Sequence, residues 1–305
     1  MTKNKNELEA NNFYKTGGTA FTLAVVFSIT LSFAYSLIIT VAAKAGGESV
    51  SEITAKNGVI ILSFFLGSLS VILALFATAI KAKVHVKSLL PAKPKDKFVY
   101  IPLALITFGF MFGLAEANEL FVSFLNKLGL SSQSVTLPEK SPLFVALTVI
   151  FVCVVPPLAE ETLFRGVLLN SLKGFGVYAA AAVSAAAFSL FHMSPAQTIY
   201  QFAVGYLYAL IALKAKSYAP TIFSHAINNL YIVLNYYFWG FEPAGAAKII
   251  LTAAGLASLV AGVALLIFVR PEKGEERDTA SAKAAVKNMI LGFIVCGVMW
   301  IIALF

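Results

Sequence analysis

Charged side chains are scarce in this 305-residue chain, of which 12% is charged and 59% is hydrophobic. Soluble globular domains carry about 25% charged residues, so this composition excludes that class and indicates a membrane protein. Cysteine is scarcer still, with two residues. Cys153 and Cys296 lie far apart in apolar stretches and form no CxxC or metal-type spacing, so we expect both to pack as small core side chains.

Long apolar runs occupy the stretches that lack charge. Because one membrane crossing needs a helix of about 20 residues, they predict an all-α, polytopic transmembrane helix bundle with eight or nine spans. The runs are continuous rather than alternating, which argues against a β-barrel. They are Thr19–Ala43, Gly58–Ile80, Phe98–Ala115, Pro142–Ala159, Val177–Phe191, Pro195–Leu213, Ala219–Phe238, Ile249–Val269 and Met289–Phe305.

The basic residues fall between these runs. By the positive-inside rule, the lysines at 3, 5 and 15 and those between residues 81 and 97 predict a cytoplasmic N-terminus. The net charge of +8 is explained by this orientation, and no nucleic-acid partner is expected. Ala43-Lys44-Ala45 resembles a signal-peptide cleavage site, but the run before it exceeds the roughly 7–15 apolar residues of such a signal. We therefore expect an uncleaved anchor.

The spans fall into three predicted segments. Residues 1–141 hold about three N-terminal spans, residues 142–240 about four, and residues 241–305 about two C-terminal spans. The middle segment is distinguished by three polar clusters within its apolar runs. Ionised groups in such a setting are costly and usually functional. The clusters are Glu160-Glu161 with Arg165, Phe188 with His192, and His225 with Asn229.

Helical spacing predicts which of these residues share a helix face. Residues four apart share a helix face, so Glu161 is expected to pair with Arg165, while Glu160, turned about 100° away, can face a cavity. The turn at 174–176 lies midway in sequence between Glu160 and His192, which predicts a similar depth for both. His225 follows the next turn by a comparable distance. We expect the clusters to meet in a chamber reached from the cytoplasmic side, beside a helix kinked by Pro156-Pro157.

This set of side chains fits the hydrolysis of an amide bond. A carboxylate in an apolar site can take a proton from water, and a nearby histidine can hold that water or protonate the leaving amine. A second histidine and an amide can stabilise the oxyanion. The sequence has no Ser-His-Asp grouping or GxSxG elbow, which favours direct attack by water.

A zinc site is the second interpretation of the same residues. Glu160, His192 and His225 match the one-carboxylate, two-histidine ligand set of catalytic zinc. The usual HExxH helix is absent, and each ligand would come from a different helix. Metal-free water activation therefore ranks first, with Zn²⁺ as the alternative cofactor.

Glu160-Glu161-x-x-x-Arg165, Phe188-x-x-x-His192 and His225-x-x-x-Asn229 resemble, in order and interval, the three motifs of the CAAX protease and bacteriocin-processing family, also called the abortive-infection family. The resemblance covers roughly residues 142–237. It implies a multi-pass intramembrane endopeptidase, often labelled a metalloprotease, in a prokaryotic plasma membrane. The implied substrate is a membrane-associated peptide or protein.

The resemblance also implies roles for single residues. Glu160 would activate water, His192 would orient that water, and His225 with Asn229 would form the oxyanion site. Glu161, Arg165 and Phe188 would be supporting residues.

Two other functions compete with the protease. One is a non-catalytic membrane immunity or scaffold protein in which the buried polar cluster only holds the helices together. The other is a proton-coupled transporter. Intact motifs weigh against the first, and the lack of a visible internal repeat weighs against the second.

Overall fold

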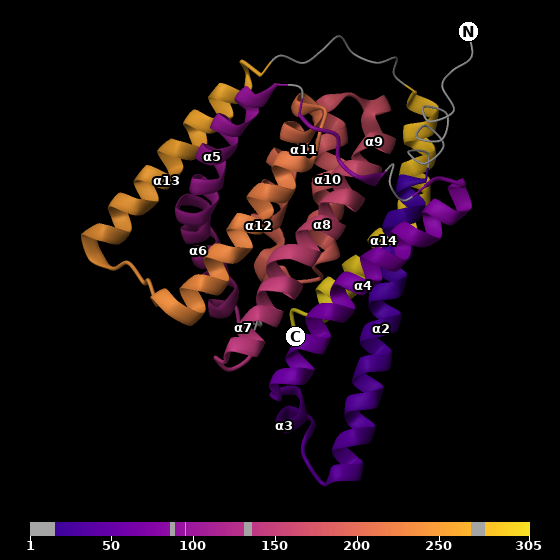
Figure 1. Cartoon of the computed structure of the whole chain (residues 1–305), viewed down its shortest axis with the longest axis vertical. Helices are drawn as coiled ribbons and strands as arrows, with labels where there is room; N and C mark the ends of the chain where they lie inside the picture. Colours follow the sequence, from indigo (N-terminus) through magenta and orange to yellow (C-terminus); the bar gives the residue numbers. More distant parts are fainter. Residues whose placement is uncertain (1–15, 86–88, 95, 131–135, 270–277) are drawn as a thin grey trace.

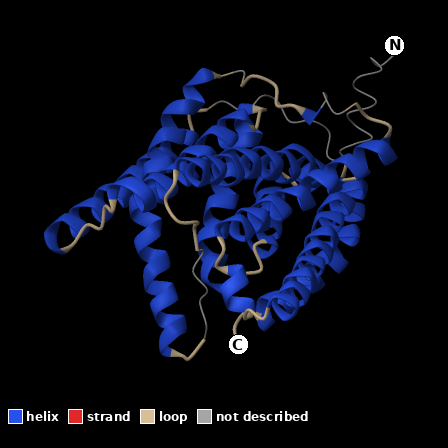
Figure 2. Ribbon diagram, turned by 60° about the horizontal axis from the view of Figure 1, so that its bottom comes forward, coloured by secondary structure: helices blue, strands red, loops and turns tan. Residues whose placement is uncertain are grey.

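A computed structural model describes residues 16–85, 89–94, 96–130, 136–269 and 278–305 of the chain. This described part consists of helices and connections, with no strand (Figure 2). Seven of its helices are long and apolar enough to cross a membrane. They are Gly17–Gly46 (α2), Asn57–Ala82 (α4), Lys97–Lys127 (η2 to α6), Pro142–Phe175 (α7 to η6), Pro195–Ala215 (η7 and α11), Gly245–Leu266 (α13) and Thr279–Ile302 (α14).

Two further helices complete the bundle. Helix α10, Val177–Phe191, is apolar but shorter than a full span, and it ends at His192. Helix α12, Ala219–Leu234, continues as the π-helical turn η8, Asn235–Trp239. Its otherwise apolar sequence contains the polar residues His225, Asn228 and Asn229. The predicted polytopic helix bundle is thus confirmed.

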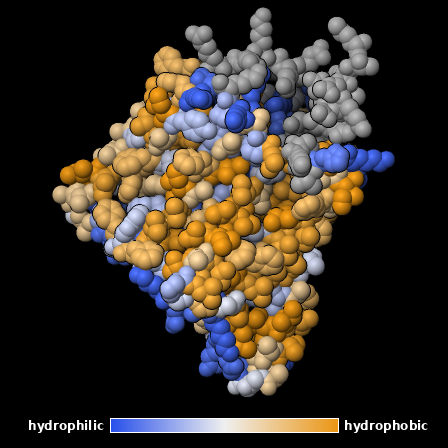
Figure 3. All heavy atoms as spheres, in the orientation of Figure 1, coloured by the Kyte–Doolittle hydropathy of each residue, from blue (hydrophilic) through white to orange (hydrophobic). Residues whose placement is uncertain are grey.

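The surface fits a protein surrounded by lipid. Hydrophobic side chains cover the middle of the face seen in Figure 3, while hydrophilic ones gather toward its ends. Large apolar side chains stand outward, among them Phe33 with 71% and Ile249 with 72% of their surface exposed. Such exposure is costly in water and favourable in hydrocarbon. The described chain is therefore an integral multi-pass membrane protein.

The helices form three groups in Figure 1. Helices α2 and α4 make a long hairpin, with the short helix α3 (Val50–Thr54) near its tip. Helices α5 (Tyr100–Gly109) and α13 pack together on the opposite side, and α8 to α12 lie between. Helix α2 approaches α14 closely because a Cβ on Gly18 would lie 2.0 Å from the Ala285 carbonyl oxygen. Small residues permit such contacts between membrane helices.

The span Pro142–Phe175 changes its hydrogen-bond pattern near Glu160. Helix α7 (Pro142–Thr148) passes into a π-helical turn, η4 (Val149–Val154), followed by α8 (Val155–Glu161) and a second π-helical turn, η5 (Thr162–Leu168). Proline cannot donate a backbone hydrogen bond, so Pro156 and Pro157 disturb the helical ladder at the start of α8. The predicted irregularity before Glu160 takes the form of the π-helical turn η4.

Candidate active site

Glu161 lies at the centre of a buried polar cluster. Its side chain has 0% exposure, and its carboxylate is held by three donors from two helices. The guanidinium of Arg165 donates to Oε1 over 2.9 Å, Thr221 Oγ1 donates to Oε2 over 2.7 Å, and His225 Nδ1 donates to Oε1 over 3.1 Å. The predicted Glu161–Arg165 pair is confirmed. A carboxylate with three donors is tied to α12 as well as to its own helix.

Arg165 is also fully enclosed, with 0% side-chain exposure. Besides Glu161, it meets the carbonyl oxygen of Gly205 at 3.4 Å and the Phe188 ring, whose centroid is 4.2 Å from Cζ. A desolvated guanidinium over an aromatic face is a favourable cation–π contact. Arg165 thus connects the first polar cluster to α10 and to helix α11 (Thr198–Ala215).

Phe188 is the ring around which the three clusters meet. Its centroid is 4.9 Å from that of His192 and 6.2 Å from that of His225, and both histidine rings are edge-on to it. Edge-to-face arrangements at these separations are favourable for aromatic rings. The clusters predicted to share a depth therefore converge, and a supporting role for Phe188 has a physical basis.

His192 lies at the end of α10, and one of its ring nitrogens makes a hydrogen bond. Nδ1 lies 2.8 Å from the carbonyl oxygen of Phe188, which can only accept, so Nδ1 carries the hydrogen. In neutral His192 this leaves the Nε2 lone pair to accept a proton or hold a water. The Glu160 carboxylate lies within electrostatic range of His192. The Glu160 side chain makes no hydrogen bond or ion pair with the described residues.

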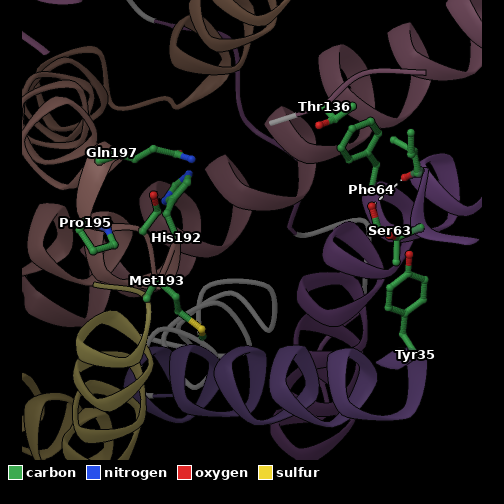
Figure 4. A pocket seen from close by; sticks show the side chains of 13 residues that line it. Tyr35, Ser63, Phe64, Thr136, His192, Met193, Pro195 and Gln197 are labelled. Carbon is green, nitrogen blue, oxygen red and sulfur yellow. Dashed lines mark hydrogen bonds between the residues drawn. The ribbon is translucent and has the colours of Figure 1, made fainter. Parts of the chain in front are cut away.

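A cavity of about 530 Å³ adjoins His192. Figure 4 shows His192 and Gln197 on one wall, with Tyr35, Ser63 and Phe64 on the facing wall and Thr136 beside Phe64. Apart from His192, the lining side chains are all uncharged. The cavity is large enough for a short peptide segment.

The position of this cavity differs from the expected access route. Its lining includes Thr54, the last residue of α3. In Figure 1, α3 and α7 lie at the end of the bundle opposite α9 (Leu169–Leu172), which precedes the turn at Lys173. The residue counts that predict access from the cytoplasmic side start at the turn at 174–176 and at the next turn, and they carry no information about the opposite end of the bundle. Helix α10 is so short that His192 sits near an opening of the fold on its other side.

Asn229 makes one hydrogen bond in the described structure. Its Nδ2 donates to the carbonyl oxygen of Val152 in η4 over 2.8 Å. His225, one turn earlier on α12, donates to Glu161 on α8. The shared face predicted for His225 and Asn229 therefore faces the span that carries Glu160.

Sequence reasoning missed several polar residues of the site. Thr221 lies four residues before His225, so helical spacing could have placed it on the same face. Tyr208 donates to or accepts from Ser224 over 2.8 Å and lies with its ring centroid 6.2 Å from that of His225. Nothing in the apolar run around Tyr208 distinguishes it from a packing residue.

The three zinc ligands considered from the sequence do not form a ready metal site. In the described part of the chain, no group of three His, Cys, Asp or Glu side chains comes together as metal ligands do. Nδ1 of His225 bonds to Glu161 and Nδ1 of His192 lies against the Phe188 carbonyl, which leaves Nε2 as the free nitrogen of each ring.

Fold and site together define a polytopic membrane protein with a buried polar centre built from the span Pro142–Phe175 and helices α10, α11 and α12. Residues 142–231 match the family described as Type II CAAX prenyl endopeptidase Rce1-like. The match covers the three polar clusters and confirms the family resemblance that they predict. Comparison with curated proteins and with solved structures finds no match.

Proposed function

We propose that the protein is an intramembrane endopeptidase that hydrolyses a peptide bond of a membrane-associated peptide or protein. The observation that carries the proposal is the division within the acidic pair. Glu161 is enclosed by three donors, whereas Glu160 makes no side-chain hydrogen bond or ion pair with the described residues and lies within electrostatic range of His192. An unpaired carboxylate beside a histidine is the arrangement that water activation needs.

The proposed reaction begins with a water held between Glu160 and His192. Glu160 takes a proton as the water oxygen attacks the substrate carbonyl carbon, and the C–N bond breaks as a proton is returned to the amine. His225, when protonated, would donate through Nδ1 to Glu161 and through Nε2 to the developing oxyanion, with the second N–H of the Asn229 amide as partner. The proposal routes no step through a metal, because the described residues include no group of three His, Cys, Asp or Glu side chains placed as metal ligands are.

The cavity beside His192 favours an uncharged peptide segment. Its hydrogen-bonding side chains include Tyr35, Ser63, Thr136 and Gln197, all neutral. A charged substrate residue buried there would lack a partner, which is costly. If the N-terminus is cytoplasmic, as the lysine distribution favours, this cavity lies toward the opposite side of the membrane. A prenylated CAAX sequence, as in the name of the matched family, is one substrate to test.

Peptidomics of membranes tests the function. Cells would express wild type, Glu160→Gln or the exposed control Glu119→Gln at matched folded levels. New peptide termini near membrane-facing segments should appear with wild type and the control and be absent with Glu160→Gln. The same termini with Glu160→Gln, or identical profiles with and without the protein, would contradict the protease. Uptake measurements with and without a proton gradient would then test the transporter alternative.

A further inference from the structure

The carbonyl of Val152 has lost both of its helical donors. In an α-helix it would accept from the backbone N–H four residues later, and in a π-helix from the one five residues later. These positions are Pro156 and Pro157, and neither carries an N–H. A backbone carbonyl without a partner is costly within a membrane, where little water is present to replace the missing donor.

Asn229 supplies the missing hydrogen bond from another helix. Its Nδ2 lies 2.8 Å from the Val152 oxygen, a normal length for such a bond. Other hydrogen-bonding side chains on α12 have different partners: His225 and Thr221 donate to Glu161, and Asn228 accepts from Tyr200. The amide at 229 is therefore the group on α12 that meets the proline-interrupted turn.

The hydrogen bond from Asn229 to Val152 bears on where the Glu160 side chain is held. Val152 precedes Glu160 by about two helical turns, and the segment between them contains the double proline. In the described structure the Glu160 carboxylate has no hydrogen bond of its own, so its place depends on its backbone. We propose that Asn229 is a positioning residue, which replaces the donors withheld by Pro156 and Pro157 and so holds the turn that aims Glu160. The catalytic consequence rests on the proposed protease function, whereas the hydrogen bond does not.

A double-mutant cycle tests the proposal. Asn229→Leu removes the donor at similar volume, and Pro156→Ala/Pro157→Ala restores backbone donors to Val152. In the native background, Asn229→Leu should lower Tm by a few degrees and cut cleavage of a substrate peptide, identified by its terminus, by up to about 100-fold. In the proline-free background, most of the loss of Tm should disappear. The loss of cleavage should shrink, in kcat rather than in KM, to the part that is owed to the missing oxyanion donor.

Asn228→Leu is the matched control, because Asn228 neighbours Asn229 but bonds to Tyr200. Its effect should be the same in both backgrounds.

If Asn229→Leu folds only in the proline-free background, that rescue supports the proposal. Equal losses of Tm in both backgrounds would overturn it. Recovery of Tm without recovery of kcat would overturn the positioning role and leave Asn229 as a group that contacts the substrate. If wild type cleaves nothing, the protease proposal fails, and the Tm cycle still tests the bond.

Discussion

The two sides of helix α8 hold neighbouring carboxylates in opposite surroundings. On one side, Glu161 has 0% exposure and accepts hydrogen bonds from Arg165, Thr221 and His225. Glu160, the neighbouring residue, is partly exposed, makes no side-chain hydrogen bond or ion pair with the described residues and lies within electrostatic range of His192. Two adjacent carboxylates therefore differ in function under the proposed mechanism: the hydrogen-bonded Glu161 stabilises the fold, and Glu160 is the proposed base.

The largest effect is expected on the Glu161 side. Arg165→Met would leave a buried carboxylate without its cationic partner, which costs about 3–5 kcal/mol. We expect a strongly reduced folded yield and Tm, measured by thermal unfolding in detergent. A Tm equal to that of wild type would show that the pair does not hold the core.

The next effect belongs to the His192 side. His192→Gln keeps a hydrogen-bonding side chain but removes the ring nitrogen that faces the proposed water. Cleavage should fall by about 100-fold with little change in Tm. If the variant lost stability but kept its turnover per folded molecule, His192 would serve the fold rather than the reaction, contrary to the proposed role.

Thr221→Val should have an intermediate effect on the Glu161 side. It removes the hydroxyl that donates to Glu161 Oε2 but keeps the side-chain shape, so it should cost about 1–3 kcal/mol of stability. Thr162→Val is the control, since that hydroxyl bonds only to the Leu158 carbonyl of its own helix. Chemical or thermal unfolding of both variants would sharpen the comparison, and equal shifts would count against a special role for Thr221.

The smallest effect is expected where an ion pair is exposed. Lys248 reaches Glu116 at 2.8 Å and Glu119 at 3.2 Å, with side chains 23–68% exposed. Exposed pairs contribute little because water screens them. Lys248→Met should leave Tm and cleavage nearly unchanged. A loss as large as that of Arg165→Met would mean that burial does not separate the two kinds of pair.

Much of this arrangement follows from local sequence patterns. Apolar runs predict the helices, and four-residue spacing predicts the contacts of Glu161 with Arg165 and of His192 with Phe188. The bond from His225 to Glu161 and that from Asn229 to Val152 join residues 64 and 77 positions apart. Helical periodicity does not define such long-range partners. The location of the cavity likewise depends on how the α2–α4 hairpin packs beside the end of α10, which spacing within one helix does not reveal.

The most direct test of the divided acidic pair measures cleavage and Tm for Glu160→Gln and Glu161→Gln side by side. Both variants keep the shape of glutamate and remove one charge. We expect Glu160→Gln to keep the wild-type Tm and lose cleavage, and Glu161→Gln to lose stability at least as much as turnover, which is the proposed division of roles. Full cleavage by Glu160→Gln, or a Glu161→Gln protein as stable as wild type, would contradict it.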